Sequence, residues 1–146
     1  MKKLPLFKPT FFLHNRAMEK NLRILVVDDS KTIRMMIRES LNNLGFFNVA
    51  EAEDGDEAFT FLIENFFENP IELILCDFEM PKLDGRGLLK ALKHDNEFSK
   101  IPFIMISGKG DLKQIIKMAK EGLKHFIVKP FDDETLMTKL EGALIK

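Results

Sequence analysis

Acidic side chains directly follow two apolar segments of the sequence. The segment Ile24–Val27 leads into Asp28 and Asp29. A later segment, Leu73–Cys76, leads into Asp77. Carboxylate oxygens suit Mg²⁺, which usually keeps several waters and takes one or two carboxylates together with a phosphate. Because an aspartate can also attack phosphorus and form an aspartyl phosphate, these residues favour metal-assisted chemistry on a phosphoryl group.

Two other apolar segments end in a serine and a lysine. Ser107 offers a hydroxyl, and Gly108 after it offers a backbone N–H with no side chain in the way. Lys129 offers a positive charge for a carboxylate or a phosphoryl oxygen. Each residue alone has an ordinary explanation, because acids cap helices, serine is common in turns and lysine is usually solvated. Their shared position at segment ends is what favours one common site.

Five short segments are predicted to be β-strands. They are Arg23–Val27, Val49–Ala52, Leu73–Cys76, Phe103–Ile106 and Phe126–Val128. All but the second are almost continuously apolar, which is typical of strands in a parallel sheet that is covered on both faces. The carboxyl ends of such strands meet at one edge, where ligands bind. The acids, Ser107 and Lys129 are therefore expected to converge in one cleft.

Helical periodicity fills the intervals between these strands. Apolar residues recur every three or four positions over residues 33–44, 54–66, 85–94, 111–122 and 133–144. Asp54, with Glu57 three positions later, predicts a capping box. Asp111 is predicted to cap the fourth helix and Asp133 to open the fifth. The stripes predicted to be buried include Met36, Ile63 and Ile116.

The composition indicates one soluble globular domain of the α/β class. A chain of 146 residues can bury a core without disulfides or metals, and strands alternating with helices predict a parallel sheet with helices on both faces. The net charge of -1, with mixed signs along the chain, favours no nucleic-acid or membrane partner. The single cysteine, Cys76, indicates a reducing compartment, and no Cys/His cluster suggests zinc.

Residues 1–20 are expected to be an N-terminal extension of a domain at residues 21–146. The segment begins with lysines and then turns apolar, as a signal peptide does, but Pro5, Lys8 and Pro9 interrupt the apolar part. Secretion is therefore not expected, and the protein is expected in the cytoplasm. Met18 offers a second start position, and the sequence leaves that choice open.

Five segments of the chain together carry a family resemblance. They are "ILVVDDS", "AEDGDEA", "LILCDFEMPKLDG", "FIMISGKG" and "HFIVKPF". Their order and spacing resemble a two-component receiver domain, and most of all the stand-alone chemotaxis regulators of the CheY type. The resemblance runs from about Leu22 to the C-terminus. It implies a flavodoxin-like, doubly wound, five-stranded parallel sheet with strand order 2-1-3-4-5.

The resemblance also assigns a metal and a phosphoryl site. It implies that Asp77 is the phosphoacceptor and that Asp29 and Asp77 bind Mg²⁺ through their side chains. Asp28 would act partly through water, and the backbone carbonyl of Glu79 would complete the protein ligands. Lys129 would contact the phosphoryl group, and the Lys129–Pro130 peptide bond would be cis.

Further roles follow from the resemblance for the end of the fourth strand and for the fifth. Gly108 would bind the phosphoryl group, Ser107 would be the switch hydroxyl, and Phe126 would be the switch aromatic, although core packing alone would also explain a phenylalanine. Phosphorylation would change the surface of helix 111–122, strand 126–128 and helix 133–144. Such a change is a population shift between two states.

The partners implied are a histidine kinase as phosphodonor and a downstream protein, with a flagellar motor component as the favoured target. Such a protein catalyses only its own phosphorylation and dephosphorylation, and a monomer is expected. Three alternatives stay open: a receiver that is never phosphorylated and acts as a protein-binding module, an aspartate-nucleophile phosphatase, and a flavin-binding protein. The phosphatase requires Asp-x-Asp, whereas Ser30 stands two after Asp28, and the acidic cleft would repel a flavin phosphate.

Overall fold

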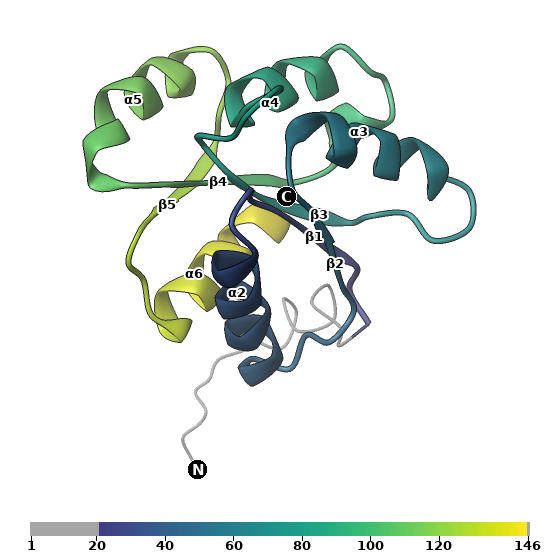
Figure 1. Cartoon of the computed structure of the whole chain (residues 1–146), viewed down its shortest axis with the longest axis horizontal. Coiled ribbons are helices and arrows are strands. Elements are labelled where there is room, and N and C mark those ends of the chain that lie inside the picture. The colour runs from purple at the N-terminus through teal and green to yellow at the C-terminus, as the bar shows by residue number, and fades with distance from the viewer. Residues whose placement is uncertain (1–20, 146) are drawn as a thin grey trace.

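The computed structural model describes residues 21–145, and in it strands and helices alternate along the chain (Figure 1). The elements are β1 (Ile24–Val27), α2 (Lys31–Asn43), β2 (Val49–Ala52), α3 (Gly55–Glu64), β3 (Leu73–Asp77), α4 (Gly85–Lys93), β4 (Phe103–Ser107), α5 (Leu112–Lys120), β5 (His125–Val128) and α6 (Asp133–Leu144). Short 3₁₀ turns cover Phe98–Lys100 and Lys109–Asp111. The N-terminal extension expected at residues 1–20 lies outside the described residues.

The five strands form one parallel sheet in the order β2-β1-β3-β4-β5. This order confirms the flavodoxin-like fold. The register aligns the carboxyl ends, because Val27 pairs with Cys76 and Asp77 pairs with Ile106. One position further, Ser107 pairs with Val128. The loops that follow β1, β3, β4 and β5 therefore begin at nearly the same height along one edge of the sheet.

Helices cover both faces of the sheet. Helices α3, α4 and α5 lie on one face, and α2 and α6 lie on the other (Figure 1). The first face buries the helix residues Ala58, Leu62, Leu88, Leu92, Ile115 and Met118. The second buries Ile37, Leu41, Leu136, Leu140 and Ala143. Alternate strand residues contribute to the two clusters, which explains why the strands other than β2 are almost continuously apolar.

Short polar side chains begin four of the helices. Ser30 accepts a hydrogen bond from the Ile33 N–H of α2 at 3.2 Å. Equivalent contacts join Asp54 to α3, Asp84 to α4 and Asp132 to α6. Asp133 is the first helical residue of α6, and the cap before it is Asp132. The Asp54 cap is confirmed, but the Glu57 carboxylate accepts from the Glu53 N–H, one residue before the cap.

The predicted apolar stripes of the helices were too wide at three positions. Met36, Ile63 and Ile116 are exposed, whereas their neighbours in sequence Ile37, Leu62 and Ile115 are buried. Successive residues of a helix point about 100° apart, so two adjacent residues cannot both face the sheet squarely. Within the described residues, no helix has the length and apolar character needed to span a membrane.

Candidate functional site

The structure brings together the three acids that follow β1 and end β3. Asp28, Asp29 and Asp77 each place one carboxylate oxygen within 4.8 Å of the others. Parallel pairing of β1 with β3 sets this arrangement, because Val27 lies beside Cys76. Asp28 and Asp77 are buried, and Asp29 is exposed. The cluster therefore has two acids in its floor and one at its mouth.

Lys129 joins the acid cluster from the loop after β5. Its Nζ donates a hydrogen bond to Asp77 Oδ1 at 3.0 Å, which makes an ion pair that is mostly shielded on the Asp77 side. The Lys129 backbone N–H donates to the Ser107 carbonyl at 2.8 Å, so the loop after β5 is tied to the end of β4. The Lys129–Pro130 peptide bond is cis, as the family resemblance implied.

Asp28 is held by its own loop and by α2. Its Oδ1 accepts from the Ser30 N–H at 2.8 Å, and its backbone carbonyl accepts from Arg34 Nη1 at 2.7 Å. Arg34 Nε also pairs with Glu51 of β2 at 2.8 Å. Asp28 Oδ2 is buried and has no hydrogen-bond partner among residues 21–145. Sequence reasoning missed Arg34, because an arginine in an amphipathic helix gives no signal of which carbonyl it will reach.

Burial shifts the acids of this site toward their neutral forms. It raises the pKa of the Asp77 carboxyl, and the charge of Asp28 raises that pKa further, while hydrogen bonding and attraction from Lys129 lower it without reversing the shift. Burial also raises the pKa of Asp28, and the hydrogen bond from Ser30 offsets this only in part. Ionised carboxylates in this setting gain from any cation that neutralises them. Acids perturbed in this way cluster at functional sites.

The chemistry of the donor set fits a hard divalent cation. Three carboxylates lie within reach of one another, and one of them has a buried oxygen with no partner in residues 21–145. These groups match the oxygen ligands that Mg²⁺ accepts. Asp28, Asp29 and Asp77 would hold the ion. The expected fourth group, the Glu79 backbone carbonyl, belongs to the loop that follows Asp77, and the Glu79 side chain is exposed.

The end of β4 supplies a hydroxyl and a backbone amide. The Ser107 Oγ is fully buried, and no partner for it is found in the part of the chain that the structure describes. The Gly108 N–H was expected to be unobstructed, but it donates to the Asp111 carboxylate at 3.0 Å. Asp111 stands at the cap position of α5, yet its side chain caps no N–H of that helix. Its expected capping role was therefore wrong, since the carboxylate turns back toward β4.

Phe126, the expected switch aromatic, lies on β5 beside Met105 of β4. It is half-buried and packs against the core cluster under α3, α4 and α5. The Lys139 ammonium of α6 lies 5.3 Å from the centre of its ring, a cation–π contact. Phe126 therefore has both a packed side and a side open to the surface near α6.

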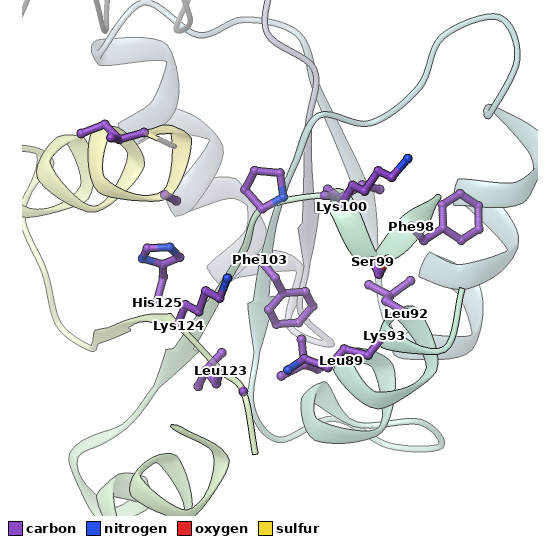
Figure 2. Close-up of a pocket in the computed structure, with 15 residues that line it drawn as sticks. Leu89, Leu92, Lys93, Phe98, Ser99, Lys100, Phe103, Leu123, Lys124 and His125 are labelled. Atoms are coloured by element: carbon purple, nitrogen blue, oxygen red, sulfur yellow. The ribbon is translucent and has the colours of Figure 1, made fainter. Parts of the chain in front are cut away.

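A groove at the opposite edge of the sheet is separate from this site. Figure 2 shows the groove, which has a volume of about 710 Å³ and is lined by Phe103 and His125, the first residues of β4 and β5. Lys93, Lys100 and Lys124 also line it, and none of its described lining residues is an Asp or Glu. It therefore has none of the groups needed for the metal chemistry of the acid cluster.

Comparison with known proteins identifies the class to which this fold and this acid cluster belong. The family model of the response regulator receiver domain matches residues 24–141. The chain belongs to the response regulator receiver family. The match includes every residue of the cluster and the whole of the sheet.

Within that family the chain is CheY-like. It is 40% identical over 123 residues to the chemotaxis protein CheY1 of Helicobacter pylori, which covers 84% of this chain and 97% of that one. It is 36% identical to the CheY homolog of Campylobacter jejuni, covering 84% of this chain and 92% of that one. It is 38% identical to CheY-3 of Vibrio cholerae, covering 85% and 92%.

Solved structures agree with the fold. A response regulator from Chloroflexus aurantiacus superposes with a TM-score of 0.78 at 26% identity, covering 87% of this chain and all of that one. The chemotaxis protein CheY4 of Vibrio cholerae superposes with a TM-score of 0.71 at 28% identity, covering 84% and 98%. The chain is thus a signalling receiver of the response regulator family, similar in sequence to chemotaxis proteins.

Proposed function

We propose that this protein accepts a phosphoryl group on Asp77 from a histidine kinase, in a reaction that depends on Mg²⁺. The observation that carries the proposal is the ion pair of Lys129 with Asp77 at 3.0 Å, beside the carboxylates of Asp28 and Asp29. A buried aspartate between a cation and two further acids is placed to react with phosphorus once a divalent ion neutralises the cluster.

The reaction is an in-line transfer. An oxygen of Asp77 attacks the phosphorus of a phosphohistidine, the P–N bond breaks, and its electron pair returns to the imidazole nitrogen. Bound Mg²⁺ would neutralise charge on the acids and on the phosphoryl oxygens. Lys129 fixes the rotation of the Asp77 carboxylate by holding Oδ1, and its ammonium then lies beside the incoming oxygens. Most of the catalysis is therefore positioning and charge neutralisation.

The new phosphoryl group then drives a conformational switch. It adds about -1.5 to -2 charges and three acceptor oxygens next to Ser107. The Ser107 hydroxyl, which has no hydrogen-bond partner among the described residues, moves to donate to one of these oxygens, and this leaves room for Phe126 to turn inward. The affected region is the output surface, which we define as α5, β5 and α6. Its altered affinity for a protein partner is a shift between two populated states.

The partners proposed are a histidine kinase and a downstream protein in a chemotaxis pathway, for which a flagellar motor component is the candidate. The relatives named as chemotaxis proteins support this assignment. We further propose that the protein acts as a monomer in the cytoplasm. Residues 1–20, outside the described part of the chain, would be an extension that the phosphoryl chemistry does not require.

Intact-mass measurement tests the proposal. Wild-type protein incubated with Mg²⁺ and acetyl phosphate is expected to gain the mass of one phosphoryl group. The Asp77→Asn variant is expected to gain none. Asp95→Asn is the matched control, because the Asp95 carboxylate follows α4 and, among the described residues, accepts only from the N–H groups of Glu97 and Phe98. A wild-type protein that stays unmodified would instead favour the protein-binding module that is never phosphorylated.

A further inference from the structure

The backbone N–H of Gly108, which follows β4, already donates a hydrogen bond in the unphosphorylated protein. The Gly108 N–H donates to Asp111 Oδ2 at 3.0 Å, and the Asp111 N–H donates back to the Gly108 carbonyl at 3.1 Å. These two bonds close a tight turn over Lys109–Asp111. A hydrogen bond to an ionised acceptor is stronger than one between neutral groups. Asp111 therefore holds the loop after β4 in a defined conformation before any phosphoryl group arrives.

This contact competes with a phosphoryl group on Asp77. Asp77 pairs with Ile106 in the sheet, so Ser107 and Gly108 directly follow the residue beside the phosphoacceptor. A phosphoryl group on Asp77 needs N–H and O–H donors at this position. The Gly108 N–H can donate a strong hydrogen bond to only one acceptor, either the Asp111 carboxylate or a phosphoryl oxygen. Two negative groups brought to one donor repel each other. The carboxylate of Asp111 must leave when the phosphoryl oxygens take its place.

The loop has room for this exchange. A Cβ added at Gly110 would meet no atom within 4 Å, so there is open space on that side of the residue between the two partners. A Cβ added at Gly108 would meet only Asp111 Oδ2, at 3.6 Å. Among the described residues, the Asp111 carboxylate is therefore the group that lies against Gly108 on the side where a Cβ would stand.

Once displaced from Gly108, the Asp111 carboxylate can bind at the N-terminus of α5. Asp111 stands at the cap position of α5, a helix of nine residues whose first N–H groups receive no side-chain cap. Aspartate is among the preferred cap residues, and a negative charge at this end of a helix is favourable. Leu112 and Ile116 in the first two turns of α5 are exposed. Movement of the Asp111 carboxylate onto α5 would therefore change the exposed first turns of this helix, which belong to the output surface.

We propose that Asp111 is a regulatory latch: in the unphosphorylated protein its carboxylate occupies the Gly108 N–H, and phosphorylation of Asp77 displaces it onto the N-terminus of α5. This inference rests on the proposed function of Asp77. In addition to the switch through Ser107 and Phe126, it gives a second way in which the phosphoryl group changes α5, namely by displacing the Asp111 carboxylate. The latch opposes phosphorylation, because its bond must break for the product to form.

Amide NMR tests the contact in the unphosphorylated protein. The Gly108 amide proton is expected far downfield in wild type, because it donates to a carboxylate, and to move upfield in Asp111→Ala. Asp132→Ala is the matched control, since Asp132 caps α6 through the Thr135 N–H and does not touch Gly108. An unchanged Gly108 resonance in Asp111→Ala would overturn the latch.

The rate of phosphorylation tests the competition. With Mg²⁺ and acetyl phosphate, Asp111→Ala is expected to be phosphorylated about three to ten times faster than wild type, the fold-change that corresponds to one hydrogen bond of ordinary net strength. Asp132→Ala is expected to match wild type. Equal rates for Asp111→Ala and wild type would contradict the inference. If wild type accepts no phosphoryl group at all, the proposed function fails and the displacement of Asp111 fails with it, while the Gly108 resonance still decides whether the Asp111 contact exists.

Discussion

The buried Asp28 carboxylate contributes to the reactive acid cluster but lowers the free energy of unfolding when it is ionised. The carboxylate is buried, one oxygen has no partner among the described residues, and the Asp77 carboxylate lies nearby. Burial therefore raises its pKa. A raised native pKa means that the folded protein binds a proton on Asp28 more tightly than the unfolded chain does. As the pH rises from the ordinary pKa of an aspartate through the raised pKa of folded Asp28, the free energy of unfolding falls. At higher pH Asp28 is ionised in both the folded and the unfolded state, and this loss of stability stays constant.

We expect the Asp28→Asn variant to be more stable than wild type when no metal is present. At neutral pH the free energy of unfolding should rise by about 1 kcal/mol, because a neutral amide replaces a desolvated charge. The gain should vanish at low pH, where Asp28 is protonated in both states. Urea unfolding followed by circular dichroism measures this, since the chain has no Trp or Tyr. Asp29→Asn, at an exposed neighbour, is the control and should change stability little. A less stable Asp28→Asn at neutral pH would contradict the expectation.

At this scale the sequence predicted which residues meet, but not all of their contacts. Strand-end positions sufficed to bring Asp28, Asp77 and Lys129 together, because parallel strands share one edge. The bond from Arg34 to the Asp28 carbonyl depends on the rotation of α2, and no periodicity reports that rotation. The turn of Asp111 toward Gly108 depends on loop dihedral angles, and a helix-capping rule predicted the opposite direction for that side chain.

Among the elements, the loop between β3 and α4 directly follows Asp77, the last residue of β3. It is held by the start of α3, where the Gly55 N–H donates to the Leu83 carbonyl at 2.8 Å. The Asp54 carboxylate also lies 3.8 Å from the Lys82 ammonium. Lys82 has a φ of 62°, a left-handed conformation that a non-glycine residue adopts only when its surroundings hold it there.

Gly55→Ala is expected to destabilise the protein through this loop. A Cβ at residue 55 would lie 2.5 Å from the Leu83 carbonyl oxygen, so the backbone must move, at a cost of about 2 kcal/mol. Gly142→Ala in α6 is the matched control, because its Cβ would meet no atom within 4 Å. That control should gain about 0.5 kcal/mol from helix propensity. Thermal unfolding by circular dichroism measures both, and a Gly55→Ala variant as stable as wild type would show that the loop is not held in this way.

Secondary structure was predictable from sequence to within about one residue at the strands, because each strand except β2 is a mostly apolar segment closed by a polar side chain. Ser107 and Asp77 proved to be the last residues of their strands, and His125 the first of β5. The helix surfaces were less predictable. Met36 and Ile116 are apolar and fall near the correct period, but only the packed structure shows that they lie beyond the edge of the sheet-facing stripe.

For the whole molecule, the two core clusters on either side of the sheet hold the four reactive loops at one edge. This explains why the fold was the most predictable feature: five strands, four of them almost continuously apolar, that alternate with five helices leave few other arrangements. The groove of Figure 2 lies at the other edge, away from the reactive loops. The output surface of α5, β5 and α6 adjoins the reactive edge through Ser107 and Lys129, which end β4 and follow β5.

The most direct measurement is the location of the phosphoryl group. Protein treated with acetyl phosphate is reduced with borohydride, which converts an aspartyl phosphate to homoserine, and peptides are then mapped by mass spectrometry. We predict homoserine at position 77 alone, formed with Mg²⁺ and absent when a chelator removes the metal. Homoserine at another acid, or at position 77 in equal amount without the metal, would contradict the claim that Asp77 reacts because Asp28, Asp29 and a divalent ion surround it beside Lys129.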